Sequence, residues 1–82
     1  MSQTNNLFTI RVDCYEGYRS EESPRRFYLN ERQVEVVEIL DRWLAPDYRY
    51  FKVKGDDGAV YIIRHDVIRS QWELTLYDGG SY

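Results

Sequence analysis

The stretch 27–43, FYLNERQVEVVEILDRW, constrains the fold more than any other part of the chain, because it can form either a helix or a β-hairpin. Asn30 followed by Gln33 resembles the capping box that opens a helix. In a helix over 31–44 the apolar side chains would form one stripe, and Pro46 would stand just past the end. A helix here would make the chain an α+β protein.

The β-branched side chains of the same stretch favour the hairpin. Four of them lie within six positions: Val34, Val36, Val37 and Ile39. Each loses side-chain freedom in a helix and packs well on a pleated sheet. Asn30 tolerates the left-handed backbone of a tight turn, and the alternation slips by one position at Val36–Val37, as a β-bulge would explain. We therefore predict a hairpin with a bulge, and a helix near 31–44 is the alternative.

The rest of the chain alternates between strand and turn patterns. The runs 8–14 (FTIRVDC), 49–54 (RYFKVK) and 72–78 (WELTLYD) have the period of two that indicates a strand with one buried face. The run 59–66 (AVYIIRHD) is apolar on both faces, as in a central strand. The sequence GDDG at 55–58 predicts a hairpin turn with a glycine at positive φ.

Other segments predict breaks and loops. Ala45–Asp47 interrupts the chain because Pro46 lacks a donor, and 16–24 (EGYRSEESP) predicts a loop. We expect flexible tails at 1–6 and 79–82 of a single domain, 1–82.

These patterns predict an all-β fold: a small, strongly bent antiparallel meander or open barrel of five or six strands. In 72–78 we expect Trp72, Leu74 and Leu76 to face inward. The predicted core is Phe8, Ile10, Phe27, Ile39, Trp43, Phe51, Ile62, Trp72 and Leu74.

Charge and cysteine content limit the function classes. The formal net charge is −3, so the chain as a whole does not attract nucleic acid or anionic membranes. Cys14 is the one cysteine and cannot close an internal disulfide, which points to a reducing cytoplasm. The N-terminus lacks a signal-peptide pattern, and no segment is apolar enough to span a membrane.

Residues for catalysis or metal binding do not form a recognisable pattern. His65 is the one histidine, so no pair of histidines or cysteines can hold zinc. Asp66 follows His65 directly and would face the other way on a strand, where it cannot orient the imidazole. Most carboxylates fall in turns, where they hydrogen-bond to local backbone. We therefore expect neither an enzyme nor a cofactor or metal site.

Aromatic and basic residues in the second half indicate a binding surface. The candidate interaction residues are Arg42, Tyr48, Arg49, Tyr50, Lys52 and Arg64. Tyrosine and arginine are favoured at protein interfaces, so a non-catalytic protein-interaction or accessory module is the first interpretation, with a homodimer through a sheet edge included. Weak nucleic-acid binding on an aromatic and arginine face is the alternative. The same residues could instead complete a small core and pair with nearby acids.

The segments PRRFYLNERQVEVVEILDRW, YFKV, DDGAVYIIRHD and WELTLYD together resemble an uncharacterised family of short bacterial proteins with a domain of unknown function. The resemblance covers about residues 10–78 and implies no catalytic residues. The chain is also weakly similar to a β-rich segment attached to some bacterial lesion-bypass polymerases. That similarity implies a nucleic-acid-associated setting in which this chain contacts a protein.

Overall fold

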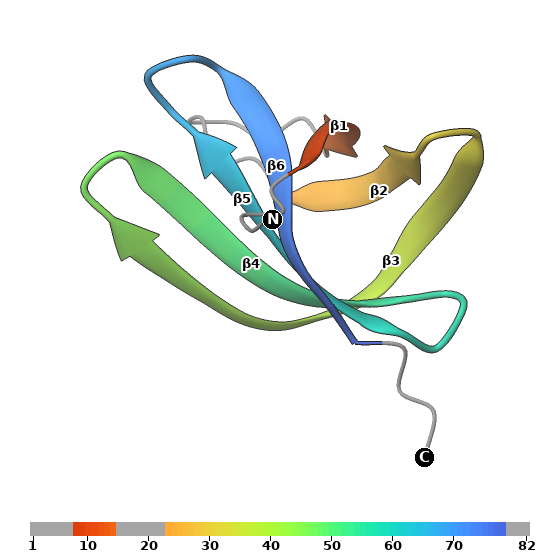
Figure 1. Ribbon diagram of the computed structural model, residues 1–82. Helices are drawn as coiled ribbons and strands as arrows, with labels where there is room; N and C mark the ends of the chain where they lie inside the picture. The colour runs from red at the N-terminus through yellow and green to blue at the C-terminus, as the bar shows by residue number, and fades with distance from the viewer. Residues whose placement is uncertain (1–7, 15–22, 79–82) are drawn as a thin grey trace, which may run out of the picture.

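The structure is a computed structural model that describes residues 8–14 and 23–78. Six strands form a closed antiparallel barrel in which each strand pairs with the next and the first pairs with the last (Figure 1). They are β1 (Phe8–Cys14), β2 (Pro24–Leu29), β3 (Arg32–Ala45), β4 (Tyr48–Gly55), β5 (Val60–Asp66) and β6 (Gln71–Asp78). The all-β prediction is confirmed, and the barrel is closed. Within 31–44, Glu31 lies in a turn and the rest is strand, so the helical alternative is wrong.

The predicted tails at 1–6 and 79–82, and the predicted loop at 16–24 except for its last two residues, lie outside the described residues. Within the described residues, no helix has the length and apolar character needed to cross a membrane.

Short turns join the strands from β2 to β6, and three of these turns are where the sequence predicts them. Asn30 has φ 56° in the two-residue turn between β2 and β3, and Gly58 has φ 86° after β4. Pro46 and Asp47 form the turn between β3 and β4. The β3–β4 and β5–β6 turns lie at one end of the barrel, which we call the turn end (Figure 1). There the Val67 N–H donates a hydrogen bond to the Asp47 carbonyl oxygen at 3.1 Å.

Strand β3 contains two bulges. The register passes from Val36 to Glu38 opposite Gly55 and Lys54, so Val37 is an extra residue, as predicted. It shifts again between Ile39 and Asp41, so Leu40 is a second extra residue that the sequence analysis did not predict. Each bulge reverses which positions face the core. The two bulges together set the outward and inward faces of the whole β3–β4 hairpin.

The core lies inside the barrel. Among the described residues, its buried hydrophobic members are Phe27, Val34, Phe51, Val53, Ala59, Tyr61, Ile63, Trp72 and Leu74. Of the predicted core, Phe27, Phe51, Trp72 and Leu74 are confirmed, and Ile10 and Ile39 pack against it while partly buried. The side chain of Phe8 lies outside the part that is described.

Three residues that were predicted to face the core face outward instead, and the strand register explains each case. Trp43 is 40% exposed, because the second bulge turns it to the outer face. Ile62 is half-buried on the outer face, opposite Lys52. Leu76 is exposed, because Thr75 is an extra residue in β6 between Leu74 and Leu76. The core is completed by residues that the prediction missed, above all Tyr61.

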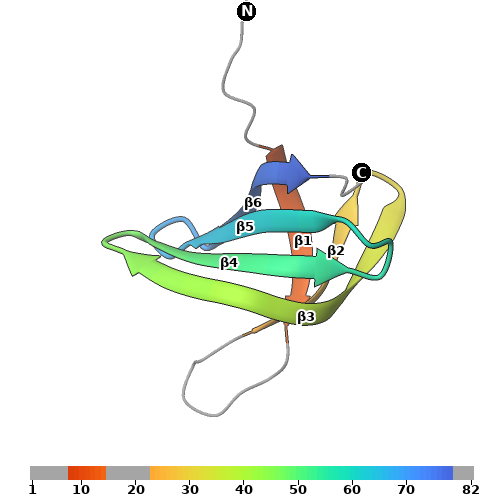
Figure 2. The same cartoon turned by 90° about the horizontal axis from the view of Figure 1, so that it is seen from below.

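Strands β1 and β3 are each shared between two neighbours. β1 pairs with β6 from Phe8 to Ile10 and with β2 from Arg11 to Cys14. β3 pairs with β2 from Arg32 to Glu35 and with β4 from Val36 onward. Figure 2 shows β3, β4 and β5 running side by side while β1 crosses behind them at a steep angle. Over the described residues, no strand pairs with the second edge of β3 from Val36 to Ala45.

Candidate interaction surface

The structure places the six candidate interaction residues on two different faces of the sheet. Phe51 and Val53 of β4 point into the core, so the alternating positions Tyr48, Tyr50 and Lys52 point outward. Arg64 of β5 pairs with Tyr50 in the register and shares the outer face. Arg42 and Arg49 lie on the inner face, because their register partners are Phe51 and Leu44. The predicted surface is therefore two surfaces.

The outer face carries a cluster centred on Arg64. Its guanidinium donates from Nε to Glu73 at 2.6 Å and from Nη1 to the Tyr50 hydroxyl at 3.3 Å, and it lies 3.9 Å from the Tyr48 ring centroid. The Arg64 and Glu73 side chains are only 16% and 11% exposed. Burial alone would lower the pKa of Arg64, but the hydrogen bonds to Glu73 and Tyr50 raise it. Arg64 is thus occupied by internal contacts that hold β4, β5 and β6 together.

The outer face also carries a pair of stacked rings. Trp43 stacks on Tyr50 with ring centroids 5.2 Å apart and an interplanar angle of 5°. The two lysines of β4 stand opposite acidic residues of β3: Lys52 pairs with Asp41 and Lys54 with Glu38. Opposite charges at these cross-strand positions partly neutralise each other. The outer face is therefore aromatic without being strongly basic.

A hollow of about 330 Å³ lies near the tip of the β3–β4 hairpin, and inner-face residues of both strands contribute to its lining. It is lined by Ser23, Arg42, Trp43, Leu44, Arg49, Tyr50 and Phe51. The Arg42 guanidinium lies 5.9 Å from the Phe51 ring centroid. No described carboxylate lines the hollow, and within residues 8–14 and 23–78 neither Arg42 nor Arg49 forms an ion pair. We call this feature the arginine hollow.

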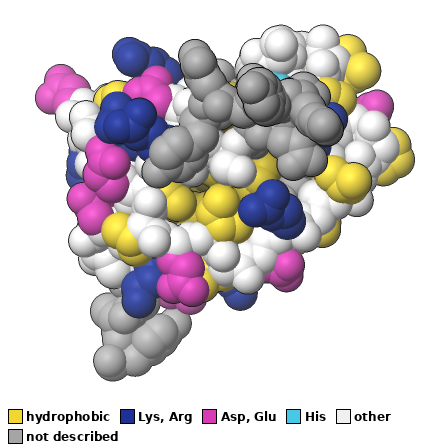
Figure 3. Space-filling view, turned by 180° about the vertical axis from the view of Figure 1, so that it is seen from behind, with side chains coloured by type: hydrophobic (Ala, Val, Ile, Leu, Met, Phe, Trp, Pro, Cys, Tyr) yellow, Lys and Arg dark blue, Asp and Glu magenta, His cyan; other side chains and the backbone are white. Residues whose placement is uncertain are grey.

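Exposed apolar side chains gather at the turn end. Leu44 and Ile68 are 78% and 73% exposed, and Trp43 and Val67 are also exposed. Leu44 lies near the end of β3 and Ile68 lies within the β5–β6 turn, and the Val67–Asp47 hydrogen bond joins the β3–β4 turn to the β5–β6 turn. Seen from behind, hydrophobic side chains appear at the centre and on the side of this end, whereas charged side chains alternate along the other side (Figure 3). Apolar surface concentrated in this way is typical of a docking site.

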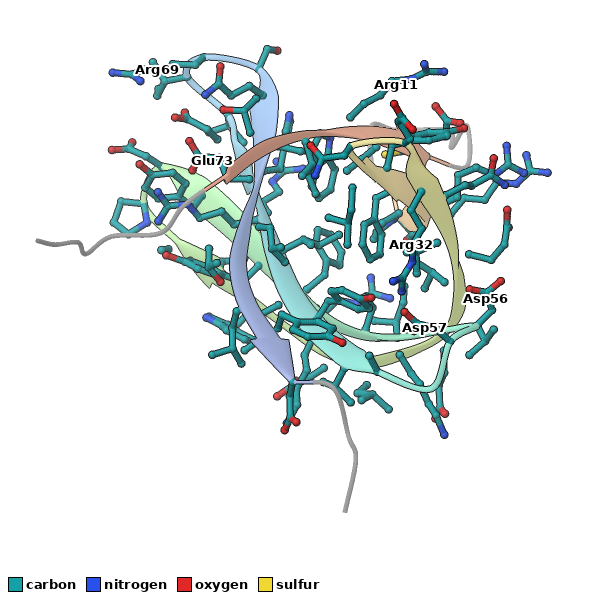
Figure 4. The ribbon with its side chains drawn as sticks, turned by 45° about the vertical axis from the view of Figure 1, so that its right-hand side comes forward. Arg11, Arg32, Asp56, Asp57, Arg69 and Glu73 are labelled. Atoms are coloured by element: carbon teal, nitrogen blue, oxygen red, sulfur yellow. The ribbon has the colours of Figure 1, made fainter. Side chains whose placement is uncertain are left out.

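A second hollow, of about 480 Å³, opens at the other end of the barrel. Arg32 from the start of β3 and Asp57 from the β4–β5 turn lie together at this end (Figure 4). The Tyr61 hydroxyl donates to Asp57 at 2.6 Å and accepts from Arg32 at 3.3 Å. This triad was not predicted, because Asp57 resembles an ordinary turn residue in the sequence and Tyr61 resembles any other tyrosine of a strand.

Ionisation in the triad follows from its hydrogen bonds. Burial alone would raise the pKa of Asp57, but hydrogen bonds from the Tyr61 hydroxyl and the Ala59 N–H, with the nearby Arg32 charge, hold it below its usual value. Burial and the bond to Asp57 raise the pKa of the Tyr61 hydroxyl. Because each polar group already has a partner inside the triad, we interpret it as a structural clamp on the β4–β5 turn.

The residues considered for catalysis have structural contacts. The His65 ring stacks on Trp72 at 4.8 Å. Asp66 faces the other way, as expected, and its Oδ1 accepts the Ile68 and Arg69 N–H groups at 3.0 Å each, which caps the β5–β6 turn. In the described part of the chain, no three histidine, cysteine, aspartate or glutamate side chains come together as they would around a metal ion.

The comparisons with known proteins add no family. The resemblance to the short bacterial proteins stays a prediction that rests on the quoted segments. No family model, no curated protein and no solved structure matches this chain.

Proposed function

We propose that this protein is a non-catalytic interaction module that binds a protein partner at the turn end of the barrel. The observation that carries the proposal is the coincidence of three features there. Leu44 and Ile68 expose apolar surface, Arg42 and Arg49 line a hollow that no described carboxylate lines, and the edge of β3 from Val36 to Ala45 has no strand partner among the described residues. Protein interfaces combine such features, since apolar anchors supply affinity and polar groups fix orientation.

Nucleic-acid binding on the outer aromatic face is the second candidate. The Trp43–Tyr50 stack supports it, because aromatic rings beside cations can stack unpaired bases. The charges of the same face weigh against it. Arg64 is bound to Glu73, and Lys52 and Lys54 stand opposite acids. A face that lacks a run of free cations has little to attract a phosphate backbone, so protein binding is the better supported function.

Site-specific photo-crosslinking in cells tests the proposed function. A photoreactive amino acid placed at Ile68 or Leu44 should form a discrete crosslink to one protein, identified by mass spectrometry and rebuilt from purified components. The same amino acid at Leu76, which is exposed on the outer face away from the turn end, is the matched control. Adding Val67→Asp beside the crosslinking site should weaken the crosslink, since a charge in an apolar contact is costly.

Two results would contradict the proposal. One is an equal yield of the same crosslink from Leu76, which would indicate non-specific proximity. The other is salt-dependent binding of single-stranded DNA in a low-salt fluorescence titration, with no crosslink to any protein. Light scattering distinguishes a partner protein from a second copy of this chain, since only the latter doubles the mass of the purified protein.

A further inference from the structure

The arginine hollow is unusual for the charge of this chain. The formal net charge is −3. Four other arginines form ion pairs with carboxylates: Arg11, Arg26, Arg32 and Arg64. Arg42 and Arg49 instead share a hollow from which described carboxylates are absent. Two like charges on one face repel each other unless an anion lies between them. As far as the described residues go, the hollow therefore presents a positive site on an acidic protein.

The geometry of the hollow combines charge with apolar surface. Arg42 and Phe51 are register partners, as are Leu44 and Arg49, so the two arginines occupy diagonal positions with apolar groups beside each. The Phe51 ring supports the Arg42 guanidinium at 5.9 Å, which limits its freedom before a ligand arrives. A guanidinium held in place can bind a carboxylate through two parallel hydrogen bonds.

The number and surroundings of the charges favour a peptide over a nucleic acid. Two guanidinium groups can neutralise one or two carboxylates, whereas a bound strand of nucleic acid presents a row of phosphates. Leu44 and Phe51 offer apolar contact that a sugar–phosphate backbone does not use. The open edge of β3, which includes Arg42 and Leu44, can also pair with the backbone of an extended peptide.

We infer that the arginine hollow binds an acidic, extended segment of a partner protein, with its carboxylates on Arg42 and Arg49 and an apolar side chain against Leu44 and Phe51. The inference rests on the proposed function, and it specifies the chemical character of the partner segment that would bind. It also separates the two basic residues that recognise the ligand from Arg64, which stabilises the barrel.

Fluorescence anisotropy with a defined probe tests the inference. The probe is a labelled peptide of about six residues, the usual length of a strand, in which glutamate alternates with leucine. The matched probe replaces each glutamate by glutamine, and a labelled single-stranded oligothymidine serves as the nucleic-acid arm. We expect the acidic peptide to bind best, with an affinity that falls as salt is added, because its charges are only partly buried.

Variants of the full chain locate the binding site. Arg42→Gln and Arg49→Gln should each lower the affinity for the acidic peptide by about tenfold, the loss expected for one charge-assisted hydrogen bond. Arg11→Gln makes the same change at a side chain of β1 that is 73% exposed and lies outside both the hollow and the turn end, and it should leave binding within about twofold, since distant exposed charges are largely screened. Circular dichroism of each variant checks that the barrel is intact.

The outcomes separate this inference from the proposed function. Equal binding of the glutamine peptide would overturn the inference but leave docking at the turn end in place. Tighter, arginine-dependent binding of the oligothymidine would overturn both. Failure of the acidic peptide to bind at millimolar concentration would overturn the inference, while the crosslinks from Ile68 would still decide the proposed function.

Discussion

At the scale of single residues, the β4–β5 turn is fixed by close contacts around Gly55. The Asp56 N–H donates to the Glu35 carbonyl oxygen at 2.9 Å, so the turn is tied to the corner where β3 leaves β2. A Cβ atom on Gly55 would lie 2.6 Å from Val34 Cγ1 and 3.1 Å from the Tyr61 ring. The sequence predicts the turn from GDDG, but only the packed structure shows that Gly55 is needed for space.

Gly55→Ala tests that close approach. We expect it to lower the free energy of unfolding by about 1–3 kcal/mol, as overpacking of a core does. Val34→Ala removes the atom that the new methyl group would meet, so the double variant should lose less than the sum of the two single changes. Urea unfolding of the four proteins measures this coupling. Additive losses would show that Val34 is not the obstacle.

Asp57 makes stability depend on pH in a stated direction. Its pKa in the folded protein lies below the ordinary value of 3.8, so the ionised group stabilises the fold above that pH. The stabilisation is lost as the pH falls below 3.8 through the folded-state pKa.

Asp57→Asn should therefore cost about 1–3 kcal/mol at pH 7, the usual range for hydrogen bonds to a charged group. The difference in the free energy of unfolding between this variant and the unmodified protein should shrink as acid protonates Asp57. Urea unfolding at several pH values down to about 2.5 measures it. Glu31→Gln makes the same change of charge at an exposed turn position and controls for net charge. A difference that stays constant across this range would contradict the assigned role.

At the scale of the element, β3 shows how far sequence reasoning reaches. The hairpin turn at Asn30 and the bulge at Val37 were predicted, because a left-handed residue and a pair of adjacent valines leave local signals. The bulge at Leu40 was missed. With one bulge Trp43 would face the core, as predicted, and with two it faces outward and Arg42 faces inward. The arginine hollow was therefore not predictable, since it depends on a register shift set by tertiary packing.

Fluorescence quenching checks which side chains of β3 face the core and which face outward. Trp72 is buried and Trp43 is exposed, so Trp43→Phe should leave blue-shifted emission that iodide barely quenches. Trp72→Phe should leave red-shifted, quenchable emission and should cost about 1–3 kcal/mol in stability, as core substitutions do. Blue-shifted, poorly quenched emission from Trp43 in Trp72→Phe would mean that Trp43 faces the core, as with a single bulge in β3, and that Arg42 does not line the hollow.

At the scale of the whole molecule, the barrel depends on a short seam. Among the described residues, β1 pairs with β6 from Phe8 to Ile10, whereas β4 and β5 pair from Tyr48 to Lys54. The all-β class and the meander order were predictable from alternation and turns. Closure was not, because nothing local in β1 or β6 specifies that the first strand meets the last.

Amide hydrogen exchange should reveal this unequal stability. We expect the amides of β1 to exchange by local opening, with much weaker protection than those of β4 and β5, because a short pairing at the edge of a sheet opens more easily. Exchange followed by NMR measures each amide. Equal protection across all six strands would show that the barrel opens only as a unit.

The seam also has a kinetic consequence. Every other strand pairing joins strands that are neighbours in the chain, but the β1–β6 pairing must bring nearly the whole chain around on itself. Loop-closure entropy opposes such a contact more than any hairpin. The hairpins of β3 to β6 can therefore assemble as an open sheet in the folding transition state, and β1 would dock last, turning that sheet into a barrel.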